Sequence, residues 1–214
     1  LRLLAAARAA GVARLVFAST AAVYGEPQGL PVDEEHPTVP LSGYGVSKLA
    51  FEQYLRIAAH TGGPRATALR FANIYGPRQD PWGEAGVVAI FGRRLLDDQP
   101  AAIFGDGSQA RDFVYVADCA RACLLALEAA DPAPWSVYNV GTGRLLTVSD
   151  LYQRLAALAG SRRPASREAA KPGEIHSICL DAGRIGSALG WRPTTGLDEG
   201  LARTLAAFRQ PATA

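Results

Sequence analysis

The alternation of apolar strand-like runs with helical patterns constrains the fold of this chain more than any other feature. Residues 14–18 form a short apolar run that is typical of a strand buried on both faces. A helical pattern over 44–60 follows, and the next apolar run covers 66–71. Strand, helix and strand in succession, without a hairpin turn, predict a parallel, doubly wound α/β sheet.

The remaining segments continue this α/β pattern less regularly. Residues 1–10 have a helical pattern, and a proline-rich stretch before residue 44 predicts a long loop. Asp106 and Gly107 lie between two apolar runs, 101–104 and 112–116, which predicts a hairpin or a tight turn. A strand is expected at 137–140, and helices are expected at 87–96, 117–129, 148–159, 182–189 and 197–208.

Charge and composition favour a small-molecule partner. The 22 basic and 20 acidic residues among 214 give a net charge of +2, which argues against a nucleic-acid surface or a polybasic membrane patch. There is no run of 18 apolar residues, so the sequence predicts no membrane span. We therefore expect neither nucleic acid nor a membrane as partner.

The cysteines and histidines have no metal-binding pattern. Cys119, Cys123 and Cys179 form an odd set without C-x-x-C spacing, and the first two lie four apart in an apolar helical pattern. These thiols are expected to be buried small hydrophobic groups in a reducing compartment, which indicates a cytoplasmic protein. No metal is expected. The acidic residues 33–35 and the arginines within 162–167 are interpreted as solvated loop faces.

A glycine-rich phosphate loop is not evident. Residues 105–110 fit G-x-G-x-x-G/A, but a strand-like run follows them, and 141–143 lacks the third glycine, so both are interpreted as turns. The chain begins at Leu1 inside a helical pattern and contains no Met. We expect that an N-terminal part carrying the phosphate loop is missing.

Tyr44 and Lys48 are the strongest candidates for chemistry. Positions i and i+4 share a helix face, so the phenol and the ammonium project into the same space. A phenol has a pKa of about 10, and an adjacent positive charge lowers such a value by roughly 1 to 3 units. The pair therefore suits general acid/base work. Ser19 and Thr20 end a predicted strand, where open α/β sheets bind ligands and a hydroxyl can donate a hydrogen bond.

Six short segments, in order along the chain, carry a family resemblance. They are FASTAAVYG at 17–25, YGVSK at 44–48, LRFANIYGPR at 69–78, RDFVYV at 111–116, NVGTG at 139–143 and KPGE at 171–174. Together they resemble the extended short-chain dehydrogenase/reductase family, specifically its nucleotide-sugar epimerases and dehydratases. A Rossmann fold and NAD are what this resemblance implies.

The same resemblance implies roles around the cofactor. Tyr44 would be the acid/base, Lys48 would hold the nicotinamide ribose and tune Tyr44, and Thr20 would bond the sugar hydroxyl. Phe71 would also contact NAD. Members that look most like this chain epimerise a UDP-hexose at C4, interconverting UDP-glucose and UDP-galactose through a transient 4-keto sugar.

Two alanines favour epimerisation over dehydration. Related dehydratases carry an Asp-Glu pair directly after the threonine, because loss of water needs an extra acid and base. Ala21 and Ala22 stand there in this chain, and alanine can neither give nor take a proton.

Substrate residues follow from the resemblance as well. Asn73 and Arg111 are expected at the diphosphate, and Phe104 is expected against uracil. Lys171 and Glu174 would lie in a segment that contacts the diphosphate. Because Lys171 stands where the family usually has Arg, a bidentate clamp would become a point charge.

The expected organisation has two parts. Residues 1–76 would be the C-terminal part of the Rossmann NAD-binding domain with the active site, and 77–214 mainly a smaller α/β substrate-binding subdomain, with segments that return to the Rossmann sheet. The full-length protein is expected to be a homodimer. Alternatives are a 4-epimerase of another UDP-sugar, an N-acetylhexosamine or a glucuronate, and a truncated, non-catalytic binding module.

Overall fold

A parallel three-stranded sheet organises one lobe of the molecule. The computed structural model describes residues 1–82, 86–130, 133–170 and 175–209. Its strands β1 (Arg14–Thr20), β2 (Arg65–Phe71) and β7 (Trp135–Val140) lie in the order β1-β2-β7. β2 is the central strand and is buried from its second residue to its last, because helices cover both faces of the sheet.

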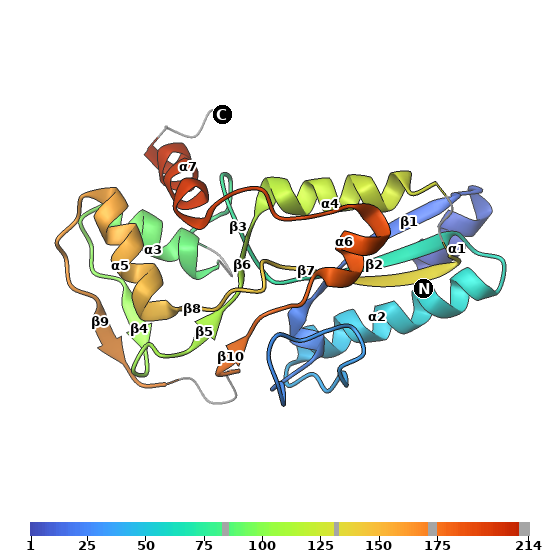
Figure 1. Cartoon of the computed structure of the whole chain (residues 1–214), viewed down its shortest axis with the longest axis horizontal. Helices are drawn as coiled ribbons and strands as arrows, with labels where there is room; N and C mark the ends of the chain where they lie inside the picture. Colours follow the sequence, from blue (N-terminus) through green and yellow to red (C-terminus); the bar gives the residue numbers. More distant parts are fainter. Residues whose placement is uncertain (83–85, 131–132, 171–174, 210–214) are drawn as a thin grey trace.

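The helices cover the sheet in two layers (Figure 1). α2 (Gly43–His60) packs on one face, and α4 (Val116–Glu128) and α6 (Gly183–Leu189) pack on the other. α1 (Arg2–Ala9) joins the α2 layer through Leu4, which shares a cluster with Leu55. The predicted parallel α/β fold is therefore confirmed.

Three helices form the core of the second lobe. α3 (Val87–Leu96), α5 (Val148–Ala159) and α7 (Leu197–Arg209) contact one another and bury Phe91, Leu151 and Leu205 in one cluster. This lobe lies on the left side of Figure 1. Its short strands are β3 (Asn73–Tyr75), β4 (Ala102–Phe104), β5 (Ala110–Arg111), β6 (Phe113–Tyr115), β8 (Leu146–Thr147), β9 (Ser166–Glu168) and β10 (Ser177–Ile178).

The hairpin expected around Asp106 and Gly107 is wrong, whereas the tight turn is confirmed. β4 pairs in parallel with β9, and β6 pairs in parallel with β3. Gly105 and Gly107 have φ of +66° and +76°, and Ser108 donates its N–H to Asp106 Oδ1. The two strands leave this turn towards different partners, so an Asp-Gly turn alone does not fix strand pairing.

The proline-rich segment before α2 is a long loop, as expected, but it is not wholly solvated. Glu34 is buried. It accepts the N–H of Asn139 at 2.7 Å and lies 3.3 Å from the Arg184 guanidinium. Burial raises the pKa of the Glu34 carboxyl. The interpretation of this residue as part of a solvated acidic trio is therefore wrong, because its partners come from segments far along the chain.

The cysteines agree with the expectation of packed small side chains. Cys119 and Cys179 are buried and Cys123 is half-buried, and none of the three forms a disulfide. Burial raises the pKa of the Cys119 thiol. Across the described residues, the search for a helix with the length and apolar character of a membrane span returns no candidate.

Candidate active site

The end of β1 presents Thr20 at the carboxyl edge of the parallel sheet. Thr20 is the last residue of this strand, and the 3-10 helix η1 (Ala21–Val23) turns the chain away immediately afterwards. Thr20 Oγ1 accepts the N–H of Ala22 at 3.2 Å. Because a hydroxyl can accept and donate at once, this contact leaves the Thr20 proton for another partner.

The first turn of α2 packs closely on this turn. Ser42 caps the helix by accepting the N–H of Gly45 at 3.1 Å. A Cβ on Gly45 would lie 2.6 Å from the carbonyl oxygen of Ala22. Glycine at 45 therefore allows the helix start to approach the chain segment that follows Thr20.

Lys48 links α2 to β1 beside Tyr44. Its Nζ donates to the carbonyl oxygen of Ala18 at 2.9 Å, and lies 5.0 Å from the ring centre of Phe17 and 5.6 Å from that of Tyr44. Tyr44 is 57% exposed. An ammonium has three N–H donors, so two remain beside the Tyr44 ring after the bond to Ala18.

One cavity of about 460 Å³ brings the predicted site residues together. It lies at the carboxyl ends of β1 and β2, the edge at which open α/β sheets bind ligands. Its lining includes Thr20, Ala21, Ala22, Tyr44, Lys48, Phe71, Asn73 and Arg111.

A second cavity, of about 680 Å³, adjoins the first. Asn73 and Arg111 line both cavities, so they stand at the boundary between them. Phe104 lies in the second cavity, as do Arg94 and Gln109, which sequence reasoning missed. Gln109 donates its amide to the carbonyl oxygen of Phe104 at 2.8 Å, and no sequence motif marks this contact.

Asp112 fixes the segment that carries these boundary residues. Its buried carboxylate accepts the backbone N–H groups of Thr142, Gly143 and Leu180. Its carbonyl oxygen accepts the N–H of Asn73 at 2.9 Å. Burial raises the pKa of Asp112 despite these hydrogen bonds, which favour the ionised carboxylate. Asn73 and Arg111 are thereby held side by side on neighbouring segments.

Two predicted residues, Lys171 and Glu174, lie outside the described residues.

Arg111 donates to the carbonyl oxygens of Ala110 at 2.9 Å and His176 at 3.0 Å. Within the described ranges, no group of three or more His, Cys, Asp or Glu side chains is placed to hold a metal ion.

Sequence reasoning also missed a buried polar network beneath the first cavity. Ser19 lines the first cavity beside Thr20, as expected for the end of this strand, but its Oγ donates to Glu52 at 2.5 Å. Glu52 also binds Arg70. One signal was available: Glu52 follows Lys48 by four residues, so Tyr44, Lys48 and Glu52 share one stripe of the helix.

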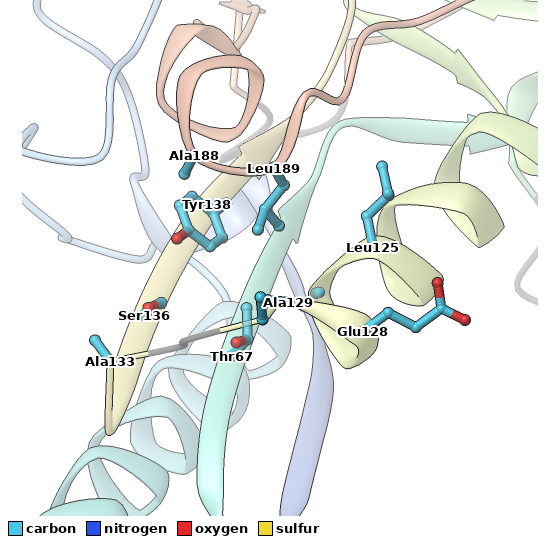
Figure 2. A pocket seen from close by; sticks show the side chains of 11 residues that line it. Thr67, Leu125, Glu128, Ala129, Ala133, Ser136, Tyr138, Ala188 and Leu189 are labelled. Carbon is cyan, nitrogen blue, oxygen red and sulfur yellow. The ribbon is translucent and has the colours of Figure 1, made fainter.

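A further hollow of about 580 Å³ lies elsewhere on the sheet, between α4, α6, β2 and β7 (Figure 2). Its lining is mainly alanine and leucine, with Thr67, Ser136 and Tyr138 as the hydroxyl groups. The side chain of Glu128 extends away from Thr67 in this view. The hollow therefore lacks the paired acid/base and cationic groups of the first cavity.

Comparison with known proteins agrees with the fold and the motifs. Residues 1–141 match the model of the NAD dependent epimerase/dehydratase family. A putative UDP-glucose 4-epimerase from Methanocaldococcus jannaschii is 45% identical over 195 residues, which are 90% of this chain and 62% of that protein.

Two solved structures extend the comparison. The UDP-glucose 4-epimerase of Thermotoga maritima with UDP-glucose superposes with a TM-score of 0.92 at 42% identity, over 97% of this chain and 67% of that one. The UDP-glucose 4-epimerase of Thermus thermophilus in complex with NAD gives a TM-score of 0.88, with the same identity and coverage.

The parallel sheet, with Thr20, Tyr44 and Lys48 around one cavity at its carboxyl edge, defines a Rossmann-type α/β protein. The chain belongs to the NAD dependent epimerase/dehydratase family. It spans about two thirds of the length of the relatives that it matches.

Proposed function

We propose that this protein interconverts UDP-glucose and UDP-galactose by NAD-dependent epimerisation at C4, through a transient 4-keto sugar. The observation that carries the proposal is the single cavity lined by Thr20, Tyr44 and Lys48 together with Asn73 and Arg111. The similarity to two UDP-glucose 4-epimerases of known structure supports it.

The donors around the first cavity fit the nicotinamide end of NAD. The two N–H donors that Lys48 keeps after its bond to Ala18 suit the hydroxyls of a ribose. Phe71 is buried beside them and offers an apolar contact. When bound, NAD would supply the acceptor and the donor of the C4 hydride.

Tyr44 and Thr20 would handle the proton at the C4 oxygen. Tyr44, as the phenolate, takes the proton of the C4 hydroxyl as the ketone forms, and the resulting phenol returns it when the ketone is reduced from its other face. The Thr20 hydroxyl, which accepts the N–H of Ala22, would donate a hydrogen bond to the C4 oxygen and orient it. The Lys48 ammonium stabilises negative charge that develops on the phenol.

The residues that follow Thr20 limit the reaction to epimerisation. Ala21 and Ala22 both line the cavity. Elimination of water from the sugar needs an additional acid and base, and methyl groups supply neither.

The second cavity would receive the UDP part of the substrate. Asn73 and Arg111 would bind the diphosphate at the boundary, where the planar guanidinium suits phosphate oxygens. Phe104 would pack against uracil. Lys171 and Glu174 are proposed as further diphosphate-segment contacts on the strength of the sequence alone.

A homodimer through α2 is part of the proposal. Val46, Tyr54 and Ile57 are exposed large apolar residues on this helix. Their spacing places them on one stripe, on the side of α2 away from Glu52 and Leu55, which are buried. An exposed apolar helix face of this kind is typical of an interaction surface.

Two coarser assignments complete the proposal. We assign residues 1–76 to the NAD-binding domain and 77–214 mainly to substrate binding, with β7 returning to the sheet of β1 and β2. The buried thiols of Cys119 and Cys179 support a cytoplasmic location.

The test is a product assay with the protein expressed from its complete reading frame. Incubation with UDP-galactose and NAD should yield UDP-glucose, and parallel incubations with UDP-N-acetylglucosamine and UDP-glucuronate measure the competing substrates. A higher kcat/KM for either competitor would move the assignment to that sugar. No conversion of any of the three would contradict the proposal and favour a non-catalytic binding module.

A further inference from the structure

A buried carboxylate on α2 lies directly below the proposed acid/base pair. Glu52 is 1% exposed. Tyr44, Lys48 and Glu52 are four residues apart in succession, so they share one stripe of the helix, and Lys48 and Glu52 both bind β1. Lys48 and Glu52 are separated by about 6 Å along the helix axis at 1.5 Å per residue. Two contacts at this separation fix both the position and the rotation of a helix.

The Glu52 carboxylate joins α2 to two strands at once. Ser19 donates to Oε1 at 2.5 Å, and Arg70 donates Nε to Oε1 at 3.1 Å and Nη2 to Oε2 at 2.7 Å. Ser19 and Arg70 are register partners in the parallel pairing of β1 with β2. Glu52 therefore spans this strand pair at one level of the sheet.

That level lies at the floor of the cavity, because Ser19 lines the cavity itself while Arg70 lies one residue before it. Thr20 follows Ser19, and Phe71 follows Arg70, and both of these next residues line the cavity. One helical turn above Glu52, Lys48 bonds to the carbonyl oxygen of Ala18. The helix is thus tied to β1 at two neighbouring points, both within two residues of Thr20.

The same network reaches the chain segment beyond Thr20. Arg70 donates Nη1 to the Tyr24 hydroxyl at 3.0 Å, and its guanidinium carbon lies 4.9 Å from the centre of the Tyr24 ring. Tyr24 in turn donates to Asn139 Oδ1 at 2.6 Å. Burial raises the pKa of Tyr24 to about 12, although the Arg70 charge opposes this, so the phenol stays a neutral donor.

An ion pair that served stability alone would not need to lie directly below the cavity, as the Arg70–Glu52 pair does. All the network side chains are buried, and Arg70 is only 6% exposed. Replacing a buried pair of this kind with apolar groups is often neutral for stability, whereas removing one partner leaves the other uncompensated. Fixing geometry is one reason to keep such a pair, and here the geometry concerned is that of α2 against the ends of β1 and β2.

We propose that Glu52 is a positioning residue, which sets Tyr44 and Lys48 relative to Thr20 by binding Ser19 and Arg70. The proposal rests on the proposed function for its kinetic consequence, but the placement itself is independent of the substrate. Glu52 is not among the residues that line the first cavity, and it takes no part in proton transfer.

The test compares Glu52→Gln with the matched control Asp118→Asn in the protein expressed from its complete reading frame. Asp118 is also a buried carboxylate with an arginine partner, Arg121, but it lies on α4 outside both cavities. In Glu52→Gln the charge opposite Arg70 is lost and an amide N–H₂ faces a donor. We expect kcat to fall by about 10- to 100-fold from this misplacement, with the KM for the UDP-sugar within about twofold of wild type.

The pH dependence of kcat separates positioning from a loss of stability. We expect the profile of Glu52→Gln to shift relative to wild type, because the phenol and the ammonium no longer keep their relation, and that of Asp118→Asn to stay unchanged. Equal kcat values for the two variants, or an unchanged profile in Glu52→Gln, would overturn the proposal. If Glu52→Gln does not fold, Ser19→Ala is the test variant. It removes the hydrogen bond from β1 to Glu52 and leaves the Glu52–Arg70 ion pair in place. Wild-type kcat in Ser19→Ala would overturn the proposal.

A crystal structure of the variant distinguishes failure of this proposal from failure of the proposed function. In Glu52→Gln, or in Ser19→Ala if only that variant folds, we expect Lys48 Nζ to move out of hydrogen-bond reach of the Ala18 oxygen, whichever substrate the protein uses. An unchanged distance of 2.9 Å would overturn the positioning role. A wild-type protein without activity on UDP-sugars but with the expected movement in the variant would contradict the proposed function alone.

Discussion

The Lys48 ammonium donates a hydrogen bond to the carbonyl oxygen of Ala18 at 2.9 Å, and so ties the first turns of α2 to the end of β1. This bond fixes one of the three ammonium protons in the direction of the sheet. The remaining two are left for partners in the cavity, which Lys48 lines together with Tyr44. The lysine therefore links the fold of the sheet edge to the chemistry proposed there.

Replacing this lysine should affect activity far more than folding. We expect Lys48→Met to lower kcat by about 100-fold or more, because the charge that favours the Tyr44 phenolate is lost. Lys48→Arg should recover only a part of the activity, since a planar guanidinium does not reproduce a compact ammonium. Steady-state kinetics and circular dichroism measure both effects. Wild-type kcat in Lys48→Met would contradict the role assigned to the ammonium.

Two glycines in the first turn of α2 provide a matched pair for the close approach to β1. A Cβ on Gly45 would lie 2.6 Å from the Ala22 oxygen and 2.9 Å from Pro40 Cβ, whereas a Cβ on Gly43 meets nothing within 4 Å. We expect Gly45→Ala to destabilise the protein by about 1–3 kcal/mol and to lower kcat. Gly43→Ala should be neutral or stabilising by up to about 1 kcal/mol. Thermal unfolding of both variants checks this, and equal melting temperatures would count against the tight approach.

The sequence predicted the sheet lobe well because its elements are long enough to show a period. The strand at 66–71 and the helix at 44–60 appear within one residue of their expected bounds. Strands such as β5 and β8 have two residues each. A two-residue strand has no alternation to detect, so the pairing in the second lobe could not be read from the sequence.

The candidate site also contains a part that local sequence spacing predicts and a part that depends on contacts between distant segments. The sequence indicates Tyr44 and Lys48 because they are only four residues apart on one helix, and Thr20 because it lies at the end of a predicted strand. The burial of Glu34 could not be predicted, since the N–H that it binds belongs to Asn139, 105 residues away. The Glu52 network was missed for a related reason: its arginine partner lies on the next strand, and a glutamate on a helix is usually solvated.

Arg111 offers a test of the boundary between the two cavities. We expect Arg111→Lys to raise the KM for the UDP-sugar by about tenfold, because loss of a charge-assisted hydrogen bond is worth about 1.5 kcal/mol, with kcat changed much less. The control is Arg154→Lys, at an exposed arginine paired with Asp198 and away from both cavities. An unchanged KM in Arg111→Lys would remove Arg111 from the substrate site.

The lowered pKa of the Asp118 carboxyl predicts that the protein loses stability in acid. Burial alone would raise the pKa of this carboxyl, but hydrogen bonds from Arg121, Thr194 and Thr195 outweigh burial and lower it to about 2. A lowered pKa in the folded state stabilises the protein above the unfolded value of about 3.9, and this contribution disappears as the pH falls from about 4 to 2. It amounts to roughly 2 kcal/mol at neutral pH.

Asp118→Asn should therefore lower the free energy of unfolding at pH 7 and reduce its dependence on pH below about 4. Denaturant unfolding at a series of pH values measures both quantities. A variant with the same acid dependence as wild type would show that the folded-state pKa of Asp118 is not lowered.

The most direct test of the central claim is the rate at which Tyr44→Phe interconverts UDP-galactose and UDP-glucose at saturating substrate. This substitution keeps the ring beside Lys48 and removes only the hydroxyl that would carry the proton. We predict that kcat falls by about 100- to 10,000-fold while the melting temperature and the KM stay close to wild type. A Tyr44→Phe protein with wild-type kcat would contradict the assignment of this site as the acid/base centre.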